Sequence, residues 1–194
     1  TELLKGGEKN KEKLDIKLCV KSVLVAVPIV VIVQIVLTLI LEKLGLNYDI
    51  VEKVNLYDST SVLSKILFFV QIAILPAIFE ELYIRKAVLD FSKKYGYTFA
   101  IISSSLLFSL IHLNISQSLF AFVMGVILAV IAFRTKSIVP TCIIHFVNNG
   151  YAALVTIFEK NEIVLNIINY IGLAILILGI FVIILEIVKN KNSV

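Results

Sequence analysis

Three short patterns in this sequence place ionisable side chains among apolar neighbours. The first is the run EELYIR at residues 80–85, and the second is a phenylalanine four positions before His112. The third places an asparagine four positions after His145. His112 and His145 are the only histidines of the chain. Ionisable groups inside membrane helices are rare and costly, so their default interpretation is functional, and these residue types support acid–base chemistry.

The two adjacent glutamates differ in the partners that a helix gives them. Glu81 and Arg85 are four residues apart, share one face and can form an ion pair. Glu80 lies about 100° around the helix from Glu81, so this arginine leaves it unpaired. A buried carboxylate holds a proton more readily than one in water, which suits a general base near neutral pH. Glu80 is therefore the glutamate that stays free for another partner. The alternative is that both glutamates lie in water at the end of a helix.

Counting along the chain shows that the three patterns can lie at one depth. Gly96 is the expected turn between the helix of Glu80 and the helix of His112, and each residue is sixteen positions from it. At 1.5 Å per residue, both then lie about 24 Å from the turn, level with each other in an antiparallel hairpin. His145 follows the basic turn at residues 134–136 by about ten residues, or about 15 Å. His145 then lies at the same depth as Glu80 and His112 if the tip of the first hairpin projects about 10 Å beyond the membrane.

The elements that must position these residues are membrane helices. The chain is 59% hydrophobic and 16% charged, with a mean hydropathy of +1.00, whereas a soluble domain is about a quarter charged. One packed core of this length cannot hide so much apolar surface from water. This excludes a cytosolic enzyme, a disordered tail and a secreted disulfide scaffold. The two cysteines, Cys19 and Cys142, are interpreted as small buried hydrophobes.

The fold class we predict is all-α, a polytopic transmembrane helical bundle with about six spans. We expect a basic N-terminal segment at 1–21, a single transmembrane domain at 22–188 with its catalytic core at about 76–150, and a tail at 189–194. The apolar stretches that reach spanning length are 22–41, 62–79, 97–113, 118–133, 138–158 and 163–188.

Basic residues cluster on alternate sides of these stretches. They precede the first span, separate spans two and three, separate spans four and five, and follow the last span. The positive-inside rule then predicts an integral membrane protein with six crossings and both termini in the cytoplasm. It also accounts for the net charge of +4 without a nucleic-acid partner. The abundance of Ile, Lys and Asn indicates a prokaryotic cell membrane.

In this order the three patterns resemble the motifs of the CPBP family. That family comprises CAAX prenyl proteases of the second type, bacteriocin-processing and immunity proteins, and abortive-infection proteins. The resemblance extends over residues 80–149, with all three motifs intact. One departure is Lys86, which follows Arg85 where many members have glycine. We expect it to affect local packing or substrate approach rather than the catalytic set.

The resemblance implies an intramembrane glutamic endopeptidase with specific roles for the motif residues. Glu80 and His112 would activate a water molecule, while His145 and Asn149 would hold the oxyanion. It implies no cofactor and no metal. The expected partners are the lipid bilayer and a peptide or protein substrate that is hydrophobic or lipidated. The residues expected to support the catalytic set are Glu81, Arg85 and Phe108.

Other interpretations of the same residues stay open at this point. A zinc-dependent peptidase is one, because Glu80 or Glu81 with His112 and His145 are competent ligands and Cys142 lies three residues before His145. A second is a non-catalytic membrane protein that binds a peptide or confers immunity. A third is a transporter with a glutamate–histidine proton relay, which the short chain without an internal repeat disfavours.

Overall fold

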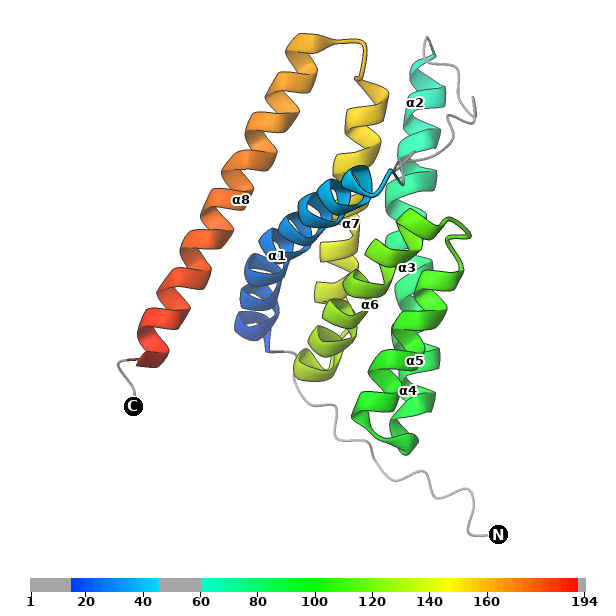
Figure 1. Cartoon of the computed structure of the whole chain (residues 1–194), viewed down its shortest axis with the longest axis vertical. Coiled ribbons are helices and arrows are strands. Elements are labelled where there is room, and N and C mark those ends of the chain that lie inside the picture. The colour runs from blue at the N-terminus through cyan, green and yellow to red at the C-terminus, as the bar shows by residue number, and fades with distance from the viewer. Residues whose placement is uncertain (1–14, 46–60, 192–194) are drawn as a thin grey trace.

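A computed structural model describes residues 15–45 and 61–191 and shows a bundle of helices (Figure 1). No β-strand occurs among these described residues. The basic residues expected before the first span fall largely in 1–14, and the polar segment after it falls largely in 46–60, so both lie outside the described part of the chain.

The described chain forms six helical rods, the second of which is a continuous rod of several segments. The second rod, Val62–Tyr95, consists of α2 (Val62–Phe69), η1 (Val70–Ile74), α3 (Leu75–Glu81), η2 (Leu82–Val88), α4 (Leu89–Ser92) and η3 (Lys93–Tyr95). The other five are α1 (Ile16–Lys43), α5 (Tyr97–Leu110), α6 (Ile115–Thr135), α7 (Val139–Ile157) and α8 (Glu162–Lys191).

Four of these rods are long and apolar enough to cross a membrane: α1, the second rod, α6 and α8. α5 is a shorter apolar helix, and α7 has 19 residues that include one histidine and two adjacent asparagines. The prediction of an all-α polytopic membrane bundle is confirmed. Only 6% of the apolar window of α8 is buried, which suits a helix that faces lipid at the edge of the bundle (Figure 1).

Gly96 forms the turn that the sequence predicts between the second rod and α5. Its φ of +102° lies in the region that residues with a side chain rarely adopt, so glycine is required here. The chain reverses at this residue, and α4 and α5 pack against each other through Leu89 and Ala100. The helix that carries the glutamates and the helix that leads to His112 are therefore antiparallel neighbours.

The main core lies where α1 packs against α6 and α7. Small and β-branched side chains of α1 contact larger apolar side chains of the other two helices, and this allows close packing without polar contacts. The buried members of this core are Ala26, Val27, Val30, Phe120, Met124, Leu128, Ile131 and Ile144. A smaller cluster of Ile84, Phe108 and Ala121 joins the second rod to α5 and α6, directly beside the polar residues described next.

Candidate active site

Two π-helical turns bracket the segment that carries the paired glutamates. They are η1 before α3 and η2 after it. π-Helical turns change which backbone carbonyls are bonded along the helix, and they occur frequently at functional sites. In η1 the carbonyl of Ile72 accepts a hydrogen bond from Nδ2 of Asn149 at 3.1 Å. The irregular turn therefore ties the second rod to α7.

Glu81 is fully buried and engages two partners through its two oxygens. Its Oε1 accepts a hydrogen bond from Nδ1 of His145 at 3.1 Å. Its Oε2 forms an ion pair with Nε of Arg85 at 3.3 Å, as the i,i+4 spacing predicts. Arg85 is itself only 1% exposed. The ion pair therefore lies inside the bundle, where its strength and its cost are both large.

Phe108 contacts three of the polar side chains. The guanidinium of Arg85 lies over its ring at 4.9 Å from the centroid, a cation–π arrangement. The rings of His112 and His145 meet it edge-on, with centroid distances of 5.3 and 5.6 Å. Because Phe108 is buried and touches both imidazoles, it fixes their positions relative to each other.

Glu80 differs from Glu81 in having room for a further partner. Its side chain is 29% exposed, and its Oε2 lies 3.9 Å from Nε2 of His145. That oxygen is buried and has no hydrogen-bond partner among the residues that the structure describes. Glu80 also interacts electrostatically with His112. A separation of 3.9 Å is too long for a direct hydrogen bond, but one water molecule can bridge it.

The hydrogen bonds around His145 define its tautomer. Nδ2 of Asn149 donates to its Nε2 at 3.1 Å, so that nitrogen acts as an acceptor. Nδ1 then carries the proton and donates it to Glu81. The two N–H groups of Asn149 are both engaged, one by Ile72 and one by His145.

His112 does not lie on a helix, contrary to the expected span of 97–113. α5 ends at Leu110, and His112 falls in the turn before α6. Its Nδ1 donates to the carbonyl of Phe108 at 2.9 Å, and the next residue, Leu113, has a φ of +53°. Asn114 then accepts from the amide of Gln117 and begins α6. These local bonds end the helix although the sequence remains apolar.

The structure thus brings Glu80, Glu81, His145 and Asn149 together directly and links His112 to them through Phe108. Tyr83, two residues after Glu81 in the first motif, is 63% exposed. Sequence analysis did not find Asn148, whose Nδ2 donates to Oδ1 of Asn149 at 3.1 Å. The sequence did contain a signal for Asn148, because two adjacent asparagines are unusual in an apolar helix.

The zinc interpretation requires three ligands within reach of one ion. Within residues 15–45 and 61–191, no group of three His, Cys, Asp or Glu side chains is close enough to hold a metal ion. What the cluster offers instead is a partly exposed carboxylate, an imidazole of fixed tautomer and an amide donor. Such a set can deprotonate a water molecule and stabilise a developing negative charge.

A polytopic helical bundle with carboxylate, imidazole and amide groups joined inside it defines an integral membrane protein with an internal polar site. Residues 62–151 match the family described as Rce1-like, type II CAAX prenyl endopeptidase Rce1-like. This match includes all three motifs and supports membership of the CPBP family, as the motifs predict. At the level of the family it is a CAAX-type intramembrane protease that acts on a peptide or protein. Neither a curated protein nor a solved structure matches the chain.

Proposed function

We propose that this protein is an intramembrane glutamic endopeptidase in which Glu80 deprotonates the attacking water. The observation that carries the proposal is the contrast between the two glutamates. Glu81 is held by His145 and Arg85, whereas Oε2 of Glu80 has no hydrogen-bond partner among the described residues and lies 3.9 Å from an imidazole nitrogen. At this separation a water molecule bound by Oε2 of Glu80 would lie beside the imidazole.

In this mechanism Glu80, with His112 beside it, takes a proton from the water, and the hydroxide oxygen bonds to the carbonyl carbon of the substrate. The carbonyl oxygen then carries the negative charge. Asn149 stabilises it, and the N–H now directed at His145 is the exchangeable donor because Ile72 holds the other. His145, whose Nε2 carries no proton in this tautomer, positions Asn149 for this role. Collapse of the tetrahedral intermediate breaks the C–N bond, and the proton taken by Glu80 passes to the leaving amine nitrogen.

Glu81, Arg85 and Phe108 are positioning residues in this proposal. Glu81 fixes the tautomer and the orientation of His145, in the way that a buried carboxylate orients a catalytic imidazole. Arg85 holds the charge of Glu81 inside the protein. Phe108 sets the spacing of the two imidazoles.

The substrate we propose is a hydrophobic or lipidated peptide, and specifically a peptide precursor of a prokaryotic membrane. The apolar surroundings of the site support a hydrophobic substrate, and the Ile-, Lys- and Asn-rich composition supports a prokaryotic source. We further propose that both termini face the cytoplasm. The start of α1, the turn after α4, the end of α6 and the end of α8 lie toward one end of the bundle and carry basic residues (Figure 1).

The decisive experiment compares the membrane peptidomes of cells that express the wild type or Glu80→Gln at equal levels. We expect the variant to lose cleavage products and accumulate their precursors, because general-base catalysis contributes about 10²–10⁴-fold to rate. Glu42→Gln is the matched control, since Glu42 is an exposed carboxylate in the last turn of α1.

Two results would contradict the proposal. One is a Glu80→Gln peptidome identical to that of the wild type, which would favour a binding or immunity role. The other is loss of cleavage on treatment of the purified protein with a metal chelator, followed by recovery with zinc. We expect cleavage to persist in the chelator.

A further inference from the structure

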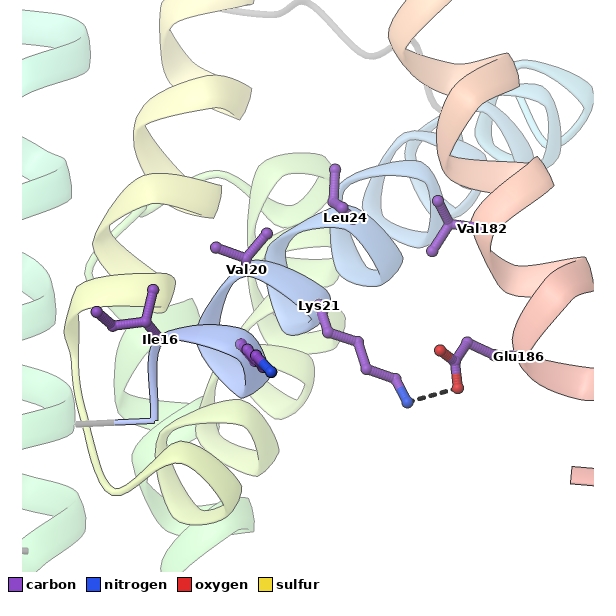
Figure 2. A pocket seen from close by; sticks show the side chains of 7 residues that line it. Ile16, Val20, Lys21, Leu24, Val182 and Glu186 are labelled. Atoms are coloured by element: carbon purple, nitrogen blue, oxygen red, sulfur yellow. Dashed lines mark hydrogen bonds and ion pairs between the residues drawn. The ribbon is translucent and has the colours of Figure 1, made fainter. Parts of the chain in front are cut away.

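A pocket of about 380 Å³ lies between the beginning of α1 and the end of α8, away from the candidate active site (Figure 2). Its α1 side carries Lys17 and Lys21 together with the apolar residues Val20 and Leu24, and its α8 side includes Glu186. The pocket is largely open to its surroundings, and its volume falls within the range of about 300–1,000 Å³ that is typical of small-molecule sites.

The pocket exists because the two helices touch at one level and are held apart at another. A Cβ atom added at Gly179 would lie 2.5 Å from Cγ of Pro28 and 3.0 Å from the carbonyl oxygen of Leu24. The backbones are therefore in close contact there. About two turns further along α8, the long side chain of Lys21 reaches across to Glu186 at 2.5 Å. The space between the helices has widened at this level, as Figure 2 shows.

The charges of this pocket leave an excess of positive charge. Lys21 is paired with Glu186, but Lys17 has no ion pair among the described residues. The apolar side chains that share the wall are partly exposed, with Val20 at 53% and Leu24 at 36%. The site thus combines an available ammonium group, at the end of two membrane helices, with an apolar surface that continues toward the membrane interior.

We infer that this pocket binds an anionic phospholipid. The phosphodiester would contact Lys17 and Lys21, and an acyl chain would lie along Val20, Leu24 and Val182. Basic pockets between membrane helices suit anionic head groups, and lysines near helix ends extend toward the interface. α1 packs into the core, whereas α8 is held mainly by its close contact with α1 at Gly179. The lipid would add a second connection between the two helices, at the level where they separate.

The test measures the unfolding midpoint of the purified full-length protein in neutral detergent micelles with added lipid. Dioleoylphosphatidylglycerol should raise the midpoint of the wild type, because a ligand that binds only the folded state stabilises it. Dioleoylphosphatidylcholine, inorganic phosphate and glycerol phosphate should not. Lys17→Gln should weaken the apparent affinity for phosphatidylglycerol by about fivefold, the size expected for one basic group at an anionic surface.

Two further variants separate this pocket from diffuse attraction. Val182→Phe fills the apolar wall without a change of charge and should reduce the lipid effect. Lys191→Gln removes a positive charge from α8 outside the pocket and should leave the effect intact. Equal stabilisation by both lipids, equal loss in Lys17→Gln and Lys191→Gln, or full stabilisation by phosphate alone would overturn the inference. Lys17 is exposed, so its variant stays informative if Val182→Phe fails to fold.

Discussion

Glu81 accepts a hydrogen bond from Nδ1 of His145 although 64 residues separate them along the chain. The bond joins the second rod to α7 inside the bundle. It also gives the adjacent glutamates different roles. Glu81 binds the imidazole and Arg85, whereas Glu80 is left for a water molecule. The predictions below test these different roles of Glu80 and Glu81 and the packing that maintains them.

The buried ion pair of Glu81 and Arg85 makes a stability prediction. Glu81→Leu should lower the free energy of unfolding by about 3–5 kcal/mol, because the buried guanidinium loses its charged partner. The double variant Glu81→Leu/Arg85→Met should recover most of this loss, since apolar replacement of a whole buried pair is often neutral. Denaturant unfolding in micelles measures both. The double variant should nevertheless remain inactive, because His145 has lost its orienting carboxylate. Equal instability of the single and double variants would contradict this account.

The tautomer of His145 gives a spectroscopic prediction. In the wild type, the ¹⁵N shifts of its ring should report a protonated Nδ1 and an unprotonated Nε2, as the bonds to Glu81 and Asn149 require. Glu81→Gln should change this pattern, since an amide presents a donor as well as an acceptor. The ring of His112 provides the internal reference. A protonated Nε2 in the resting wild type would show that Asn149 does not donate to it.

Asn149 and Asn148 form a matched pair for testing the oxyanion role. Asn149→Ala should lower the cleavage rate by about 10²–10³-fold, the usual cost of one lost oxyanion donor. Asn148→Ala should have a smaller effect, since Asn148 reaches the site only through its bond to Oδ1 of Asn149. Single-turnover cleavage of a substrate found in the peptidome comparison measures both rates. A larger loss in Asn148→Ala than in Asn149→Ala would be incompatible with the proposed role.

Gly125 allows α6 to approach the helix that carries Phe108. A Cβ there would lie 3.1 Å from Cα of Ser105 and 3.3 Å from the ring of Phe108. Gly125→Ala should therefore cost about 1–3 kcal/mol through overpacking and should also slow cleavage by displacing Phe108. Gly150→Ala is the control, because its nearest contact is 3.7 Å and alanine favours the helix by up to about 1 kcal/mol. Unfolding midpoints and cleavage rates that are alike in the two variants would refute this explanation.

Gly179 sets the contact between α1 and α8. Gly179→Ala places a methyl group within 2.8 Å of two ring atoms of Pro28, and a proline ring in a helix cannot move aside. The unfolding midpoint should drop, while the folded fraction should keep its cleavage rate, because α8 carries no candidate site residue. Gly172→Ala should cost less, since its nearest neighbour is the partly exposed ring of Tyr151. Loss of cleavage in fully folded Gly179→Ala would assign α8 a role in the site.

Much of this architecture was predictable because it depends on local sequence. Gly96 as the turn, the ion pair of Glu81 with Arg85 and the shared face of His145 and Asn149 all follow from helix geometry and residue type. Counting residues from Gly96 predicted that Glu80 and His112 lie level with each other, and the two groups interact electrostatically in the structure. Long apolar stretches recur throughout the chain, so the helical rods could be predicted from hydropathy alone.

The features that could not be predicted depend on backbone atoms and on distant contacts. The carbonyl of Ile72 binds Asn149, but a carbonyl leaves no trace in the residue type. The two π-helical turns occur in sequence that is equally compatible with an α-helix. The end of α5 before His112 was missed for a related reason. Apolar residues continue through the turn, and only the ring of His112 on the carbonyl of Phe108 shows where the helix stops.

The π-helical turn at Val70–Ile74 makes the site sensitive to chain length as well as to side chains. Loss of a single residue from this turn would allow ordinary α-helical pairing to close, and the segments on either side would keep nearly the same relative orientation because the turn already accommodates the extra residue. Glu80 and Glu81 would still face α7, but the carbonyl of Ile72 would be drawn into the regular helix and Asn149 would lose this partner. Loss of a residue from the start of α3 would instead rotate both glutamates by about 100° relative to the segment before it. An in-frame deletion of one codon is therefore enough to separate an inserted, stable helix from a working one.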